Sequence, residues 1–334
     1  MPADETVARH ATSGDRPFPE TLPKTLVPKV LIVTLFEPEA KLWFAGKTHT
    51  YTVPGAFSPL FCDDAGLCMM ISGRGIANTA VSMAIVGAHP QIDLRKTYII
   101  APGIAGGKPD QISLGSVALV EWAANGDSGY RVDRTELPSN FEFENFRYGC
   151  LQPWCDPSPS FSYNNDIFHL DRDLITAAMS ITKTVKLEDN DLAKNYRLTY
   201  RQKEARQPPS LKACDLVSGD TFFHGAKMSA WATWWLKQWS KDKGEYCVSA
   251  MEEPGLLLAI KRLSEDGRID FSRILILRSV ANYDQPRSGQ TVVQSLEGRN
   301  NGHDISFKNV FFVGSAIAEA ILRNWTDWEV GVPR

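Results

Sequence analysis

A nearly unbroken apolar and β-branched segment, residues 30–36 with the sequence VLIVTLF, places the strongest constraint on the fold. A strand with one face in water alternates apolar and polar residues, so a run without alternation predicts a strand buried on both faces. Such strands occur in sheets that helices cover on both sides. Further strands are expected at residues 68–73, 97–103, 117–120, 213–218, 246–251 and 274–280.

Helical patterns fall between these strands. The predicted helices cover residues 76–84, 171–185, 226–239 and 254–263, and residues 309–314 lead into a closing helix through Ala320 and Leu322. The segment 171–185 is amphipathic, and its apolar residues recur at helical spacing. The alternation of strands and helices predicts an α/β fold.

The chain divides into a short leader and one large unit. A length of 334 residues, with 43% hydrophobic and 22% charged residues, is typical of a globular protein. Residues 1–26 are polar and rich in proline, so we expect a flexible N-terminal segment. Residues 27–330 are predicted to form a single domain, into which a largely irregular insertion is placed at about 127–211. Within this insertion, residues 188–209 are predicted to form a polar segment that runs over the protein surface.

The charge balance limits the partners. A net charge of -3 and a pI near 6.1 give no electrostatic reason to expect nucleic acid or an anionic membrane. The uncharged apolar runs are shorter than the ~20 residues that a membrane span requires. We therefore expect a soluble protein with no membrane span, secreted if a signal peptide has been removed and cytoplasmic otherwise.

Six cysteines form suggestive pairs along the chain. The pairs are Cys62 with Cys68, Cys150 with Cys155, and Cys214 with Cys247. The even count permits disulfides, but buried free thiols are also ordinary in a chain of this length, and we favour the thiols. The doubled C-x-x-C spacing of a zinc site and the H-E-x-x-H pattern are both absent from the sequence, so no metal is expected.

Two adjacent carboxylates, Glu252 and Glu253, stand at a predicted junction between a strand and a helix. An ionised carboxylate withdrawn from water costs several kcal/mol unless donors meet it, which favours a ligand or a partner here. Glu in a first helical turn is equally explained by the helix dipole. In α/β sheets ligands collect at the carboxyl ends of strands, so the residues that follow each strand form the candidate site.

Five short segments in order resemble the nucleoside phosphorylase and nucleosidase superfamily. They are GIAGG at 103–107, LGSV at 114–117, SGDTF at 218–222, AME at 250–252 and RSVAN at 278–282. Within it the chain is most similar, over roughly 27–325, to the fungal and bacterial purine nucleoside permease family. The resemblance implies a three-layer α/β/α fold with a central mixed sheet, a purine nucleoside as substrate, and a homodimer.

The resemblance also implies how the sugar and the base are held. Met251 and Glu252 match a Met-Glu pair whose glutamate grips the ribose 2′- and 3′-hydroxyls. Phe222 resembles the aromatic that stacks on the purine, although a core Phe is the alternative. The remaining substrate-binding candidates are Phe223, Gly103 and Ile104.

The residue that assists the departing base is left between two candidates. Asn282 stands where nucleosidases carry an aspartate that protonates purine N7, and an amide cannot donate that proton. Asn282 can instead hydrogen-bond N7. Alternatively, Asp284 supplies the acid, since burial can raise the pKa of a carboxyl for that purpose, or it caps a turn before Pro286.

The first predicted strand decides the reaction class. Phosphorylases of this fold need glycine and arginine there, whereas Glu37 and Glu39 follow this strand. Glu39 matches a water-activating glutamate, and Arg278 matches an arginine that orients it. Ile104 replaces a serine or threonine of relatives, which weakens a phosphate site. Arg74 either substitutes for phosphate-binding arginines or is a surface charge.

The sequence therefore predicts a purine nucleosidase, a hydrolase of N-glycosyl bonds that uses no metal and no cofactor. A purine nucleoside phosphorylase is the first alternative, and a soluble nucleoside-binding protein associated with uptake is the second. His224 and His303 are either ribose 5′-hydroxyl contacts or structural residues. The Trp-rich helix at 226–239 is expected to form core or a subunit interface.

Overall fold

The computed structural model describes residues 18–150, 155 and 164–333, and a mixed sheet lies at its centre. The main sheet runs in the order β1-β3-β4-β5-β2-β6-β14-β13-β8-β11, and β15 pairs with both β6 and β7, which in turn pairs with β12. Its strands are β1 (Pro19–Glu20), β2 (Val30–Thr34), β3 (His49–Tyr51), β4 (Leu60–Cys62), β5 (Leu67–Ile71), β6 (Tyr98–Gly107), β7 (Val117–Leu119), β8 (Trp122–Asn125), β11 (Ile167–His169), β12 (Leu211–Ala213), β13 (Asp215–Ser218), β14 (Tyr246–Ala250) and β15 (Ile274–Tyr283).

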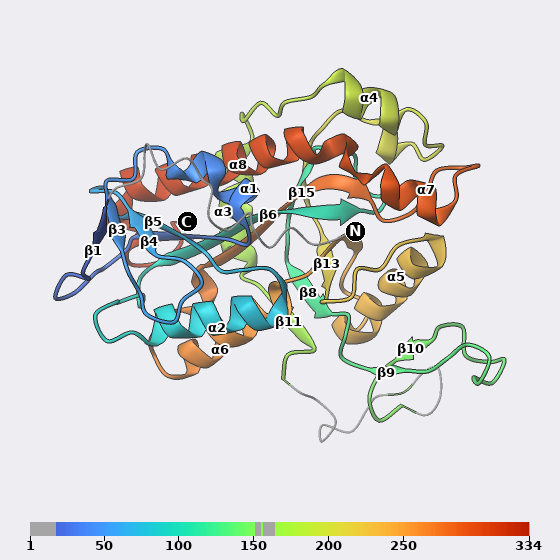
Figure 1. The fold of residues 1–334 in the computed structure, drawn as a ribbon, viewed down its shortest axis with the longest axis horizontal. Coiled ribbons are helices and arrows are strands. Elements are labelled where there is room, and N and C mark those ends of the chain that lie inside the picture. The colour runs from blue at the N-terminus through green and yellow to red at the C-terminus, as the bar shows by residue number, and fades with distance from the viewer. Residues whose placement is uncertain (1–17, 151–154, 156–163, 334) are drawn as a thin grey trace.

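Helices cover both faces of this sheet. The helices are α1 (Glu37–Ala40), α2 (Gly75–Ala88), α3 (Arg172–Thr182), α4 (Asp191–Arg197), α5 (Ala226–Ser240), α6 (Glu253–Glu265), α7 (Val292–Glu297), α8 (His303–Arg323) and α9 (Trp325–Trp328). Figure 1 shows α8 along one side of the sheet and the packed pair of α2 and α6 along the other. The expected α/β fold with three layers and a mixed sheet is confirmed.

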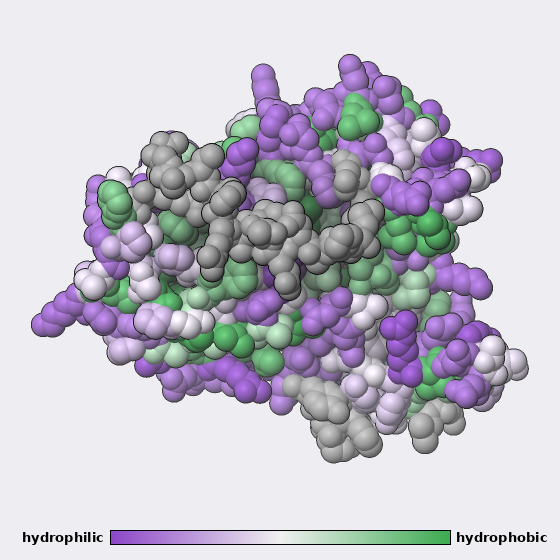
Figure 2. Space-filling model, viewed as in Figure 1, coloured by the Kyte–Doolittle hydropathy of each residue, from purple (hydrophilic) through white to green (hydrophobic). Residues whose placement is uncertain are grey.

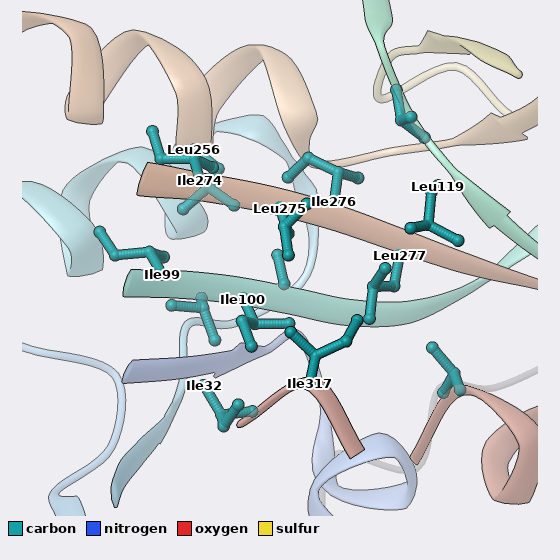
Figure 3. Packing of buried hydrophobic residues seen from close by; sticks show 14 of the residues in the cluster. Ile32, Ile99, Ile100, Leu119, Leu256, Ile274, Leu275, Ile276, Leu277 and Ile317 are labelled. Carbon is teal, nitrogen blue, oxygen red and sulfur yellow. The ribbon is translucent and has the colours of Figure 1, made fainter. Parts of the chain in front are cut away.

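The central strands show why residues 30–36 lack alternating polar residues. Every residue of β2 is buried, and β2 pairs in parallel with β5 and β6. β6 in turn pairs in parallel with β15 over most of its length, whereas β14 joins β6 antiparallel. In Figure 3, Ile317 of α8 points toward the strands that carry Ile32, Ile100 and Leu277. The strand buried on both faces is therefore the middle of one hydrophobic core.

Two glycine positions allow close approaches in this fold. A Cβ on Gly255 in α6 would overlap the backbone oxygen of Ile76 in α2, so the two helices touch there without a side chain between them. A Cβ on Gly103 in β6 would overlap Nη1 of Arg278 in β15. The second approach matters for function because it leaves room for a guanidinium beside the sheet.

Several elements extend beyond their predicted bounds. β6 continues to Gly107 and β15 to Tyr283; β15 is buried throughout, and β6 is buried except at the half-buried Ile104. Residues 309–314 do not precede the closing helix but lie within α8, which begins at His303 and buries Val310, Val313 and Ile317 at helical spacing. Residues 188–209, expected as an excursion without a helix, contain α4.

The termini of the expected domain stay predictions. Residues 1–17 lie outside the described residues, and β1, within the expected leader, pairs in parallel with β3. The segment 127–211 contains α3, α4 and a separate small hairpin of β9 (Tyr130–Arg131) and β10 (Asn145–Phe146). Figure 1 shows the hairpin projecting beside α5.

The preference for free thiols is wrong. All the expected cysteine pairs are disulfides: Cys62 with Cys68, Cys150 with Cys155, and Cys214 with Cys247. Cys62 and Cys68 face each other across the antiparallel strands β4 and β5. Cys247 is the second residue of β14, and it is bonded to Cys214, which directly precedes the neighbouring strand β13. Spacing in the sequence could propose the pairs, but it is their proximity in the fold that decides that they bond.

Among the described helices, α8 alone is long and apolar enough to cross a membrane, by length and composition. Half of its most apolar stretch is buried inside the fold, where α8 packs on β15 and β6. The apolar side of α8 therefore packs against the hydrophobic core.

The view in Figure 2 shows how polar and apolar residues are distributed over one side of the molecule. Polar residues dominate its rim, and apolar surface appears in the region of α7, whose Val292 and Val293 are exposed.

Candidate active site

A cavity of about 340 Å³ opens where several strands of the main sheet end. Its volume lies within the range of small-molecule sites, which is about 300–1,000 Å³. It is lined by Leu35, Phe36, Glu39, Arg74, Ile104, Ala105, Gly106, Thr221, Phe222, Phe223, Ser249, Ala250, Met251, Glu252, Asn282 and His303. A neighbouring cavity of about 90 Å³ shares Thr221 and Phe223 with it but has none of the predicted catalytic residues in its wall. The larger cavity is the candidate site.

The structure brings most of the predicted site residues into this one wall. Glu39, Ile104, Phe222, Phe223, Met251, Glu252 and Asn282 line the cavity. Gly103 and Arg278 lie directly behind it, paired across β6 and β15. Asp284 is not in the lining.

Glu39 is fixed in place by two backbone amides. It lies in the first turn of α1, just after β2, and only 4% of its surface is exposed. Its Oε1 accepts a hydrogen bond from the Ile104 amide at 2.8 Å, and its Oε2 accepts one from the Leu35 amide at 3.0 Å. Burial raises the pKa of Glu39 to about 7, although the Arg278 cation and the two amides act in the opposite direction. A carboxyl with this pKa can take a proton at neutral pH.

Arg278 is fully buried, and its closest partner is Glu253. The guanidinium pairs with Glu253 Oε1 through Nε and Nη2, and Glu253 Oε2 accepts a hydrogen bond from the Ser218 hydroxyl at 2.6 Å. Glu252 Oε2 lies farther away, at 3.7 Å from Nη2. Glu253 is completely buried, so the helix dipole is not the whole explanation of this acid. The helix does begin at Glu253, but the side chain neutralises a buried cation.

Glu252 points toward the cavity and the start of α2. It is 6% exposed, and its Oε1 accepts a hydrogen bond from the Gly75 amide at 3.3 Å. Burial raises the pKa of Glu252, while the Arg278 cation opposes that rise. Asp220, from the segment after β13, accepts a hydrogen bond from the next amide of α2, that of Ile76, at 2.8 Å. The first two amides of α2 therefore each donate a hydrogen bond to a carboxylate from another segment.

The two adjacent phenylalanines have different environments. Phe222 is 51% exposed although it lines the cavity, which excludes the alternative of a core Phe. Phe223 is buried and meets Trp231 of α5 edge-on, with ring centroids 5.4 Å apart. Trp231 and Trp235 form a second hydrophobic cluster, as expected for the Trp-rich helix. The exposed Phe222 ring lies roughly parallel to that of His224, with centroids 6.5 Å apart, and Phe223 packs in the wall beside it.

Asn282 and Asp284 lie at the end of β15 but differ in access. Asn282 lines the cavity, and its Nδ2 donates to the Tyr283 carbonyl at 3.0 Å. Asp284 is 1% exposed, and its Oδ2 accepts a hydrogen bond from the Tyr246 hydroxyl at 2.8 Å. Burial raises the pKa of Asp284 to about 7.

Several lining residues were missed or given less weight in the sequence. Ser249 lies near the end of β14, two residues before Met251, and alternate residues of an extended chain share a face, so this spacing could have identified Ser249. Arg74 is exposed, lies over the Phe36 ring at 4.5 Å, and lines the cavity beside α2. His303 lines the cavity, whereas the half-buried His224 does not. Among the residues that the structure describes, no cluster of His, Cys, Asp or Glu could hold a metal ion.

Comparisons with known sequences show the family of the chain. A sequence model of the family described as purine nucleoside permease (NUP) matches residues 27–333. A Schizosaccharomyces pombe protein named as a probable purine nucleoside permease is 31% identical, over 90% of this chain and 91% of its own. A Candida albicans purine nucleoside permease is 25% identical, over 96% of this chain and 80% of its own.

Solved structures of nucleosidases share the fold. The 5′-methylthioadenosine/S-adenosylhomocysteine nucleosidase of Neisseria meningitidis superposes with a TM-score of 0.53 at 19% identity, over 88% of this chain and 99% of that one. The futalosine hydrolase of Helicobacter pylori superposes with a TM-score of 0.54 at 12% identity, over 87% of this chain and 98% of that one. At these identities the likeness is one of fold, and it confirms the expected architecture.

Proposed function

The chain belongs to the purine nucleoside permease family, and we propose that it is a purine nucleosidase that hydrolyses the N-glycosyl bond of purine ribonucleosides to free base and ribose. One observation carries the proposal: the Glu39 carboxyl at the cavity wall is held by two amides and has a pKa of about 7. This is the arrangement that a general base for water needs.

In the proposed reaction, Glu39 removes a proton from a water molecule that attacks the anomeric carbon. Its two hydrogen bonds to Ile104 and Leu35 fix the carboxyl orientation, so the water is positioned before the substrate arrives. Arg278, behind Gly103, keeps positive charge near Glu39 and limits the rise of its pKa. Arg278 is a positioning residue because it lies behind the wall.

Glu252 binds the ribose in this proposal. Its carboxylate can accept hydrogen bonds from the 2′- and 3′-hydroxyls, which satisfies a charge that is otherwise buried. Its negative charge also stabilises the oxocarbenium-like sugar that develops as the bond breaks. Met251, its neighbour, supplies apolar contact on the same side of the cavity.

The base is placed between Phe222 and the end of β15. The exposed ring of Phe222 stacks on the purine, and Asn282 hydrogen-bonds N7. Phe223, Gly103 and Ile104 shape the surrounding wall. Because Ile104 stands in place of a serine or threonine, the wall has no side-chain hydroxyl at this position.

We also propose a homodimer, in which a second subunit covers the exposed Phe222. Light scattering at several protein concentrations tests it, and a monomer at all of them would refute it.

Water is favoured over phosphate by the charges around the cavity. A helix N-terminus is a common phosphate site, but the first amides of α2 already donate to Glu252 and Asp220. The buried Arg278 is paired with Glu253. A phosphate dianion in the cavity would lie near the acids Glu39 and Glu252, which repel it, and Arg74 would be the cation in the wall that attracts it.

The experiment is base release from adenosine, guanosine and inosine in buffer freed of phosphate. We expect free base and free ribose, with loss of hydrolysis but retained nucleoside binding in Glu39→Gln. Glu37→Gln is the matched control, since Glu37 is an exposed acid in the same helical turn. Full activity in Glu39→Gln would refute Glu39 as the base.

Two alternatives have specific support and are separated by the same assay. The position of Arg74 in the cavity wall favours a phosphorylase, which would release base only with phosphate and would yield ribose 1-phosphate. The relatives named permeases favour a nucleoside-binding protein associated with uptake. A wild-type protein that binds nucleoside in calorimetry but releases no base under either condition would support that second role.

A further inference from the structure

A chain of hydroxyl groups connects the buried Asp284 to the cavity. Tyr246, at the start of β14, donates its hydroxyl hydrogen to Asp284 Oδ2 at 2.8 Å. The Ser249 hydroxyl, three residues on in the same strand, approaches the Tyr246 hydroxyl closely enough to lower its pKa. Ser249 lines the cavity, whereas Tyr246 and Asp284 do not. The sequence of contacts therefore runs from a buried carboxyl to a hydroxyl at the site.

Gly106 marks the point at which these groups meet the wall. A Cβ placed on Gly106 would lie 2.7 Å from Ser249 Oγ, 3.3 Å from Asn282 Nδ2 and 3.9 Å from Asp284 Cβ. The three side chains thus surround one glycine that itself lines the cavity. Ser249 and Asn282 reach the same place from two strands, and Asp284 lies one layer deeper.

The environment of Asp284 favours a carboxylic acid over a carboxylate. Its Oδ1 is buried and has no hydrogen-bond partner of good geometry, although the Ser229 hydroxyl of α5 approaches the group. A buried carboxylate with an unsatisfied oxygen is unfavourable, and a proton on the group relieves that penalty. Burial accordingly raises the pKa of Asp284 to about 7.

We propose that Asp284 is the proton source for the departing purine and acts through Tyr246 and Ser249, a role that rests on the proposed nucleosidase activity. Asn282 can hold the base but has no acidic proton to give. Asp284 has one but cannot reach the cavity. Ser249 and Tyr246 supply the path between them.

The transfer balances along the chain of contacts. As the bond between the anomeric carbon and the base breaks, its electron pair goes to the purine, and the Ser249 hydroxyl gives its proton to a purine ring nitrogen. The Tyr246 hydroxyl reprotonates Ser249, and the carboxylic acid of Asp284 reprotonates Tyr246. The hydrogen bond between Tyr246 and Asp284 reverses its direction when the acid is protonated. Asp284 ends as a carboxylate and regains a proton from solvent after product release.

The test compares leaving groups that need a proton with leaving groups that do not. Guanosine needs one, whereas 7-methylguanosine carries a fixed positive charge on its base, and p-nitrophenyl ribofuranoside releases a stable anion. The variants are Tyr246→Phe, Ser249→Ala and Asp284→Asn, with Ser229→Ala as control because Ser229 touches Asp284 outside the chain of contacts. Thermal unfolding identifies any variant that fails to fold.

We expect kcat for guanosine to fall by about 10²–10⁴-fold in the relay variants, the usual contribution of a general acid. Hydrolysis of the two acid-independent substrates should stay within about threefold of wild type, since only the proton transfer is lost. An equal loss on all substrates, or no loss on guanosine in folded Tyr246→Phe and Ser249→Ala, would overturn the relay alone. A wild-type protein inactive on every substrate would instead defeat the nucleosidase proposal.

Discussion

Glu253 forms the closest ion pair with Arg278, and its neighbour Glu252 does not. Both partners of that pair are completely buried, and the Ser218 hydroxyl holds the second carboxylate oxygen of Glu253. Adjacent acids in the chain thus have separate duties: one neutralises a cation behind the wall, and the other faces the cavity. Their substitution should have different consequences.

Glu253→Gln should destabilise the protein by about 3–5 kcal/mol, the effect of leaving a buried charge without its partner. Glu252→Gln should change stability less and instead weaken nucleoside binding, because Glu252 lies at the cavity. Urea unfolding and a binding titration on both variants measure the two effects. Equal destabilisation by the two substitutions would contradict this division.

The rate should depend on pH through Glu39, whose pKa burial raises to about 7. The general base must be ionised, so kcat/KM should rise with pH and level off above about 7, where the free protein has lost that proton. If Asp284 must be protonated, it adds a falling alkaline limb for guanosine that 7-methylguanosine lacks. Glu37→Gln should keep the acidic limb. A rate that does not change from about two pH units below the pKa of Glu39 to about one unit above it would exclude Glu39 as the base.

The same group affects folding with a predictable sign. The folded pKa of Glu39 is raised from 4.5 to about 7, so the folded state holds the proton more tightly and stability falls as pH rises across that interval. The fall attributable to Glu39 should be on the order of 3 kcal/mol. Glu39→Gln should lack it, which urea unfolding at a series of pH values can detect.

Gly103→Ala should displace Arg278, since the added methyl group overlaps Nη1. Overpacking of this kind typically costs about 1–3 kcal/mol, and here it also moves the cation beside Glu39. We expect lower thermal stability and reduced hydrolysis. Gly298→Ala is the control, because its nearest neighbour is 3.4 Å from the added atom. Unchanged activity in Gly103→Ala would show that the position of Arg278 is not needed.

Phe222→Ala should weaken nucleoside binding by about 1–3 kcal/mol, the usual contribution of a base stacked on an aromatic ring. Stability should change little because Phe222 is 51% exposed. Phe18→Ala, at a ring 91% exposed on the edge of the sheet, is the matched control. Equal effects of the two substitutions on KM would remove Phe222 from the site.

Loss of the bridge between Cys214 and Cys247 should destabilise the fold by about 2–4 kcal/mol. The double variant Cys214→Ser with Cys247→Ser tests this by urea unfolding. Intact-mass measurement before and after reduction counts the bridges independently. Three free thiol pairs in unreduced protein from its natural source would contradict the disulfides.

The sequence was sufficient to place the strand ends together. A strand buried on both faces requires helices on both sides, and parallel strands then direct residues such as Glu39 and Asn282 to one edge. The resemblance to a family added the roles, which stay proposals. The buried runs also predicted the central strands β2, β5, β6, β14 and β15, but not the short strands β3, β4, β8 and β11.

Other features depend on three-dimensional contacts that no spacing encodes. The backbone turn before α6 decides which of Glu252 and Glu253 meets Arg278. The path from Asp284 to Ser249 passes through Tyr246, a residue that in the chain is merely the start of an apolar strand. The bonding of Cys214 to Cys247 follows from the pairing of β13 with β14.

Redesign of this pocket into one that accepts phosphate would require more than added cations. The amides of Gly75 and Ile76 are already saturated by acids from two other segments, so both Glu252 and Asp220 would have to release them. Removing Glu252 would sacrifice the proposed sugar contact at the same time. A single substitution is therefore a poor route between the two chemistries, and any such change in evolution would have had to alter the sugar site along with the nucleophile.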